Sequence, residues 1–209
     1  ILRKTSQAMS ELESYRYHID AVVSIEANRS QMEIPISADG RTMGEVTESI
    51  LTITLLGFPI RSTAVQVGTE IYVSDSDGDK WSPARGLVLG LISPGFWAGN
   101  GLDFAAIPFE GEPEISELDG DPVYIYRSSE GLEEDWLFRL LGTVEGAENV
   151  TVKDAEIMMW IDRNKFLLRK IQVSLSAPNG GTFIADQLGF TNSSGLGGST
   201  LELVLVLSE

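Results

Sequence analysis

The sequence contains no cysteine, and its 209 residues include a single histidine, His18. Disulfide bonds, thiol chemistry and thiolate metal sites are excluded, because each of them requires cysteine. Histidine-based triads and histidine metal sites are disfavoured, since one imidazole has no second histidine to work with. His18 falls on the polar face of an alternating segment, which favours an exposed spacer over a catalytic residue.

Positive charge is also scarce, with 15 Lys and Arg residues against 31 Asp and Glu, a formal net charge of −16. This balance argues against nucleic acid as a partner and against electrostatic docking on anionic lipid. We interpret the acidic surface as a source of solubility rather than as a specific binding site. Long apolar runs are missing too, since no segment approaches the roughly 20 residues that span a bilayer.

Motifs for catalysis or cofactor binding are equally lacking. Glu133 and Glu134 open a predicted short helix, where adjacent acids stabilise the helix dipole more often than they serve a glycosidase. The alternating Asp residues of 75–79 favour a hairpin turn over a calcium loop, because strands flank them. The glycines of 195–198 do not follow a strand and open a helix, as a nucleotide loop does. We therefore expect no enzymatic activity, no metal and no cofactor.

The clearest pattern that is present is a β-hairpin over residues 155–175. Alternating apolar residues predict two strands, and the polar residues 162–165 predict the turn between them. Met159, Ile171 and Val173 belong to the apolar face. Met158 and Trp160 make the opposite face apolar as well, so that something covers this face or it lines a cavity.

The rest of the chain is predicted to be antiparallel strands joined by short polar turns. Helical spacing of apolar residues predicts an amphipathic helix over residues 1–14. Alternation predicts strands at 15–26, 32–38, 49–55, 63–67, 71–73, 123–127 and 201–207. The last of these is apolar on both faces towards its end, which indicates a central strand. We expect a turn at 178–181 leading into 182–185, and a flexible loop at 192–199.

Two further segments are rich in apolar residues without strand alternation. Residues 82–117 are broken by Gly and Pro, which favours short helices and loops, and residues 133–142 predict a short helix. So much apolar surface on irregular backbone is either buried or a contact surface. Two interpretations stay open: a lid over a cavity, or a helical layer that completes an ordinary core.

Several short motifs resemble those of a known family. They are the Ile-Leu-x-Lys…Ala-Met-x-x-Leu-x-Ser-Tyr segment of residues 1–15, the Tyr-Val…Lys-Trp segment of 72–81, and the closing hairpin, in which a Trp-Ile-Asp arm precedes a Leu-x-Arg arm. In the order of its elements nearly the whole chain resembles the LolA-like bacterial lipoproteins, most closely the LppX/LprG type.

This resemblance implies an α+β fold: a curved antiparallel sheet forms a half β-barrel, with an N-terminal helix and with short helices and loops over the concave face. It implies one domain over residues 1–209. The implied function is non-enzymatic binding and transport or presentation of a lipid or other hydrophobic ligand at the bacterial cell envelope. The alternative is an RseB-like envelope-stress sensor or protein-interaction module of the same fold.

The resemblance also implies an extracytoplasmic monomer that is tethered only by a lipidated cysteine upstream of Ile1, after a signal peptide. The family has no invariant catalytic set to carry over, so the candidate site is the apolar lining of the cavity. Alternation and the lid segments predict these lining residues: Tyr17, Ile19, Val23, Leu51, Ile53, Leu55, Val65, Leu87, Leu91, Phe96, Trp97, Phe104, Trp136, Leu140, Met159, Ile171 and Val173.

Overall fold

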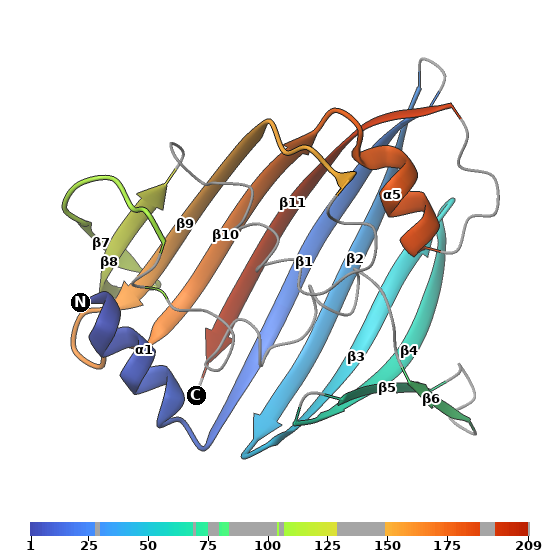
Figure 1. Ribbon diagram of the computed structural model, residues 1–209. Coiled ribbons are helices and arrows are strands. Elements are labelled where there is room, and N and C mark those ends of the chain that lie inside the picture. The colour runs from blue at the N-terminus through green and yellow to red at the C-terminus, as the bar shows by residue number, and fades with distance from the viewer. Residues whose placement is uncertain are drawn as a thin grey trace.

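The computed structural model describes residues 1–27, 30–68, 70–74, 80–83, 104, 107–128, 149–188 and 195–208. This part of the chain forms two helices and eleven strands (Figure 1). The helices are α1 (Leu2–Ser10) and α5 (Gly180–Gln187). The strands are β1 (Ser14–Ala27), β2 (Ser30–Met43), β3 (Val46–Leu55), β4 (Phe58–Val67), β5 (Glu70–Ser74), β6 (Trp81–Pro83), β7 (Glu114–Leu118), β8 (Asp121–Ser128), β9 (Asp154–Asp162), β10 (Leu168–Ala177) and β11 (Leu196–Ser208).

The eleven strands form one antiparallel sheet in the order β6-β5-β4-β3-β2-β1-β11-β10-β9-β8-β7. The sheet is open, because β6 and β7 are edges and do not pair with each other. The predicted α+β fold, an incomplete barrel with an N-terminal helix, is confirmed. The predicted central place of the last strand is confirmed as well, since β11 lies between β1 and β10.

Both helices lie on the same side of the sheet, which we call the concave face; the other side is the convex face (Figure 1). On the concave face α1 buries Thr5 and Met9, and the Met9 Sδ accepts a hydrogen bond from the backbone N–H of Leu168 at 3.3 Å. Neither helix of the described residues is long enough to cross a bilayer. The predicted helix over 1–14 is present as α1, but it ends at Ser10.

The segment after β10 differs from its predicted form. The glycines at 180 and 181 do not close a simple turn but begin α5, which packs on β11 and β1. A Cβ added at Gly180 would lie 2.2 Å from the Ser199 Oγ, and one at Gly181 would lie 2.6 Å from the Gly197 carbonyl oxygen. The close approach of α5 to β11 thus requires glycine at both positions. Part of the predicted loop at 192–199 is also strand, because β11 begins at Leu196.

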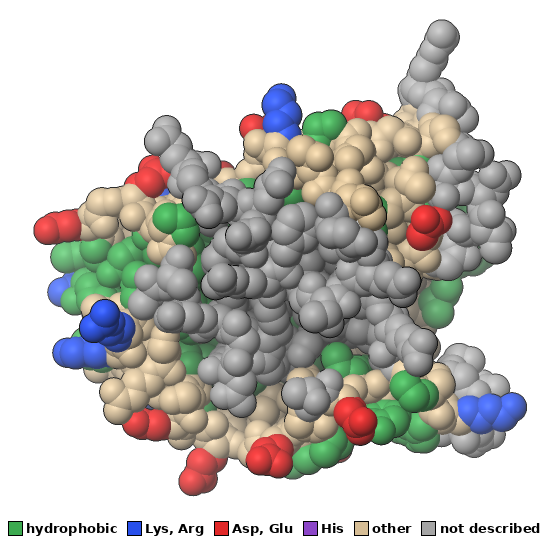
Figure 2. All heavy atoms as spheres, in the orientation of Figure 1, with side chains coloured by type: hydrophobic (Ala, Val, Ile, Leu, Met, Phe, Trp, Pro, Cys, Tyr) green, Lys and Arg blue, Asp and Glu red, His purple; other side chains and the backbone are tan. Residues whose placement is uncertain are grey.

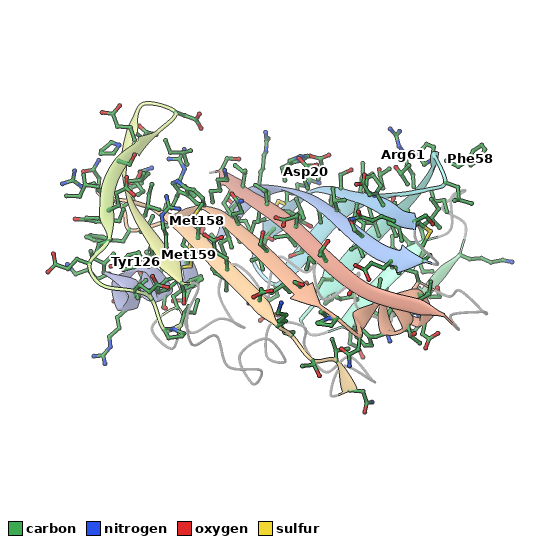
Figure 3. The ribbon with its side chains drawn as sticks, turned by 90° about the horizontal axis from the view of Figure 1, so that it is seen from above. Asp20, Phe58, Arg61, Tyr126, Met158 and Met159 are labelled. Atoms are coloured by element: carbon green, nitrogen blue, oxygen red, sulfur yellow. The ribbon has the colours of Figure 1, made fainter. Side chains whose placement is uncertain are left out.

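The convex face at the β8–β9 end carries a second, smaller apolar cluster. Val123, Ile125 and Trp160 are buried there, with Leu118 and Met158 packed against them. The β7–β8 hairpin supplies Leu118, Val123 and Ile125, and in Figure 3 it rises on the side of the sheet where Asp20 and Arg61 are labelled. This hairpin explains why the sequence has apolar residues on both faces of β9.

Candidate functional site

The concave face is built by alternate residues of the strands. The register pairs Ile19 of β1 with Ala38 of β2 and Leu205 of β11, and Ile171 of β10 with Met159 of β9. Continuing this alternation places no Asp, Glu, Lys, Arg or His on the concave face of the described strands β1–β4, β9 and β11. On β10, Arg169 follows the same alternation as Ile171, beside a β-bulge, and lines the hollow next to α1. Figure 2 looks onto this side and shows the acidic side chains of the described residues around the margin. Apart from Arg169, the charged side chains of these described strands therefore lie on the convex face by alternation.

The structure brings together most of the predicted lining residues that it describes. The buried ones join one hydrophobic core: Tyr17, Ile19, Val23, Leu51, Phe104, Met159, Ile171 and Val173. Ile53 and Leu55 of β3 are half-buried and pack against this core. The remaining positions lie outside the described residues: Leu87, Leu91, Phe96, Trp97, Trp136 and Leu140.

Val65 does not join this set. It pairs with Glu48 of β3 and Tyr72 of β5, and these pairs project from the convex face. The interpretation that Val65 lines the concave face needs correction, because β4 is apolar on both faces and alternation within the strand does not show which face is inside. The concave residue next to it is Ala64, which is buried.

Two hollows open on the concave side of the described residues. One of about 120 Å³ lies between α1, the start of β1 and the β9–β10 turn, and its lining combines apolar residues such as Met9 with the charged Asp162, Lys165 and Arg169. The other, of about 40 Å³, lies beneath α5 and is lined in part by Val23 and Phe183. Both are smaller than the roughly 300–1,000 Å³ of typical ligand pockets.

One end of the concave face is polar rather than aliphatic. The register aligns Tyr15, Thr42 and Thr47 in one row across β1–β3, and Tyr17, Gly40 and Ser49 in the next row. The hydroxyls of Thr42 and Thr47 lie 2.9 Å apart, within hydrogen-bond distance. Burial raises the pKa of Tyr15, and a hydrogen bond with the Thr42 side chain partly offsets this rise. Sequence reasoning missed these rows, because aligning hydroxyls on three strands requires the strand register.

The convex face has a wider, open hollow of about 620 Å³. Its lining combines the Arg41–Glu48 ion pair, whose closest nitrogen–oxygen distance is 2.9 Å, with the exposed apolar side chains of Ile50 and Trp81. Trp81 comes from the short edge strand β6, and the other three residues come from β2 and β3. This surface is accessible and mixed in polarity, so it is shaped for contact rather than for enclosing a ligand.

His18 lies on this convex face between two carboxylates. Its Nδ1 is 2.7 Å from the Asp39 Oδ1, and its Nε2 is 2.9 Å from the Asp20 Oδ2. The hydrogen bond with Asp39 is the largest cause of the rise in the pKa of His18; burial acts in the opposite direction, and the bond with Asp20 adds to the rise. The described residues contain no group of three or more His, Cys, Asp and Glu side chains that is placed to hold a metal ion.

No protein-family model matches the sequence, and no curated protein matches it either. Among solved structures, LprF from Mycobacterium bovis superposes on this chain with a TM-score of 0.50 at 10% sequence identity, over 100% of this chain and 90% of LprF. The chain has a LolA-like fold. A LolA superfamily protein from Nitrosomonas europaea is also similar, with a TM-score of 0.33 at 13% identity, over 100% of this chain and 90% of that protein.

Within this LolA-like fold, the candidate site is the concave face of the sheet. Its aliphatic part was predicted from alternation in the sequence, whereas its polar end and the convex hollow were not. Long-range register decides both, since Gly40 and Ser49 become neighbours of Tyr17 only when β1, β2 and β3 align.

Proposed function

We propose that this chain is a non-enzymatic protein that binds a lipid or other hydrophobic ligand against the concave face of its sheet and carries or presents it at the bacterial cell envelope. The observation that carries this proposal is the segregation of charge. The concave face of the described strands β1–β4, β9 and β11 bears no Asp, Glu, Lys, Arg or His, and Arg169 is the charged side chain that β10 adds at one end, while the convex face bears Asp20, Asp39 and Arg41.

Desolvation is the driving force that this face offers. Each CH₂ group of an acyl chain that moves from water onto an apolar surface contributes about 0.8 kcal/mol. A charged side chain on the same surface would oppose binding, because burying an unpaired charge carries a large desolvation penalty. The described strands β1–β4, β9 and β11 offer an apolar concave surface without such a side chain.

The LolA-like fold supports the remaining parts of this proposal. We infer an extracytoplasmic location, a monomer, and tethering through a lipidated cysteine upstream of Ile1. The partners of the chain are then a lipid or another hydrophobic small molecule, and not nucleic acid.

The test is native mass spectrometry of the protein purified from a bacterial envelope, followed by solvent extraction and lipid analysis. A stoichiometric acyl-chain species that copurifies, or binding of an added fluorescent fatty acid, would support the proposal and show the class of ligand. A clean apo mass without binding of any added lipid would contradict it.

A matched pair of variants on β1 shows which face binds. Ala21 is buried on the concave face, and its neighbour Val22 lies on the convex face. Ala21→Phe adds bulk where the ligand is expected, so that it should weaken binding at least tenfold, while Val22→Phe should leave binding unchanged. Circular dichroism of both variants controls for folding, because overpacking a core costs about 1–3 kcal/mol.

A second candidate function is a protein-interaction module of the same fold, as in RseB-like regulators. The observation that favours it is the open convex hollow with exposed Ile50 and Trp81. An Ile50→Asp variant that loses a partner protein in a pull-down, from a wild-type protein that binds no lipid, would favour this function instead.

A further inference from the structure

The Tyr17 hydroxyl is a buried polar group whose hydrogen bond is not made. Tyr17 is 4% exposed and belongs to the hydrophobic core on the concave face. In the described part of the chain, the Tyr17 hydroxyl is the one buried side-chain polar atom that has no hydrogen-bond partner. Because folded proteins satisfy the great majority of such groups, an unsatisfied one calls for an explanation, and an absent ligand is one.

The backbone around Tyr17 is shaped to hold this hydroxyl. A Cβ added at Gly40, the cross-strand neighbour on β2, would lie 2.4 Å from both the Cζ and the hydroxyl oxygen of Tyr17. The end of the ring therefore occupies the space above Gly40. Ser49 on β3 comes next in the same row and is buried at 7% exposure. The Tyr17 and Ser49 side chains thus share one row across the gap that Gly40 leaves.

Ser49 acts on Tyr17 without completing its hydrogen bonding. Burial raises the pKa of Tyr17 to about 12, and a long, poorly aligned side-chain hydrogen bond with Ser49 partly offsets this rise. The two hydroxyls do not meet the distance and angle of a full hydrogen bond. At neutral pH Tyr17 is therefore protonated and available as a donor.

The neighbours of this pair are neutral and polar on one side and aliphatic on the other. The row towards the start of β1 contains Tyr15, Thr42 and Thr47, whereas the row in the opposite direction contains Ile19 and Leu51. The concave face therefore changes from hydroxyl groups to aliphatic groups at the row of Tyr17. A surface of this kind matches an amphiphile rather than a plain hydrocarbon.

We propose that the hydroxyls of Tyr17 and Ser49 form a polar subsite that binds the uncharged, hydroxyl- or carbonyl-bearing headgroup of an amphiphile, while the apolar part of this ligand lies on the aliphatic rows beyond. The proposal rests on the function proposed above, and adds the chemistry of the headgroup. The headgroup is uncharged, because β1–β4 present no Asp, Glu, Lys, Arg or His on the concave face around this row, and Arg169 of β10, which lines the hollow beside Tyr15, is already paired with Asp121 and Asp162.

The competing explanation is structural: the Tyr17 ring covers Gly40 and its hydroxyl plays no part in binding. Tyr17→Phe separates the two explanations, because it keeps the ring over Gly40 and removes only the oxygen. The matched control is Tyr126→Phe, on the same face but on β8, where Tyr126 packs against Phe109 with ring centroids 5.2 Å apart (Figure 3). Ser49→Ala is the second variant, and it removes the other hydroxyl of the subsite.

The experiment measures the Kd of two probes with the same tail, decyl β-D-glucoside and decyl phosphate, for the delipidated protein and each variant. We expect the wild type to favour the glucoside. Tyr17→Phe should weaken glucoside binding by about threefold to tenfold, the effect of one neutral hydrogen bond, and leave phosphate binding unchanged. Ser49→Ala should act in the same direction, and Tyr126→Phe should change neither Kd.

Denaturant unfolding of the apo protein provides a second readout. Removing a hydroxyl that has no partner should leave the free energy of unfolding unchanged or raise it, whereas removing a bonded one should lower it. Glucoside binding that is equal in wild type and Tyr17→Phe, an equal loss for both probes, or a clear loss of stability would overturn the subsite and leave the hydrophobic site standing. If neither probe binds the wild type, the proposed function fails as well.

Discussion

Leu56 occupies a strained backbone position at the tip of the β3–β4 hairpin. It is 83% exposed, and its φ is +51°, in the left-handed region that Gly and Asn adopt more readily than Leu. Phe58, two residues on, is also exposed and is labelled in Figure 3. The tip therefore presents two apolar side chains to solvent, and the backbone conformation at Leu56 is unfavourable for leucine.

We predict that Leu56→Asn stabilises the protein by about 0.5–1 kcal/mol, because Asn tolerates positive φ and the exposed leucine contributes little packing. Urea unfolding of the variant measures this change. Ile60→Asn is the control: it removes an exposed apolar residue from the same hairpin at a position of ordinary strand backbone. An equal gain from Ile60→Asn would show that backbone strain is not the cause.

His18 gives the protein a local dependence on pH. We predict that the pKa of His18, followed by NMR titration, lies above its ordinary value of 6.5 and falls in Asp39→Asn, because Asp39 is the largest cause of the shift. A raised pKa in the folded state stabilises the fold fully below pH 6.5, and this contribution is lost as the pH rises through the folded-state pKa.

The stability that Asp39→Asn removes should therefore be larger at about pH 5.5 than at about pH 8.5. The His18 side chain is 44% exposed, so the effect should stay within about 1 kcal/mol because solvent screens the pair. Unfolding curves of wild type and variant at both pH values test this. A loss that is the same at both would exclude a charged His18 from the network.

At the scale of elements, the β7–β8 hairpin holds its place through the convex cluster around Trp160. The Lys170 Nζ lies 4.6 Å from the centroid of the Trp160 ring and covers it from β10. We predict that Trp160→Ala lowers the free energy of unfolding by about 3 kcal/mol, because it leaves Val123 and Ile125 without their largest neighbour. Trp81→Ala, at a tryptophan that is 50% exposed, should cost less than about 1 kcal/mol. Similar losses in the two variants would contradict the role of the cluster.

The same elements show what the sequence could predict and what it could not. Alternation within a strand depends on neighbouring residues, so the β9–β10 hairpin and the central place of β11 followed from the pattern. Placing Val65 on a face, and aligning Ser49 with Tyr17, depends on pairing between strands, which no local pattern carries. The helix α5 was missed because Gly180 and Gly181 are poor helix formers. Glycine is needed at both positions because α5 lies close to β11, a contact that the local sequence does not reveal.

For the whole molecule, one sheet joins elements from both ends of the chain, and we propose that residues 1–209 form a single domain. We predict one cooperative unfolding transition, in which circular dichroism and tryptophan fluorescence change together and the calorimetric and van't Hoff enthalpies agree. Two separated transitions would show that the chain consists of independently folding units and would contradict the single domain.

The pairing of β1 with β11 has a consequence for how the molecule acquires its structure. The first strand of the chain lies between β2 and β11, so the middle of the sheet is closed only when the last strand is available. Such distant contacts slow folding, because a long loop must be ordered before they form. During synthesis, one edge of β1 therefore stays unpaired until β11 has been made, and an unpaired strand edge of this kind favours aggregation.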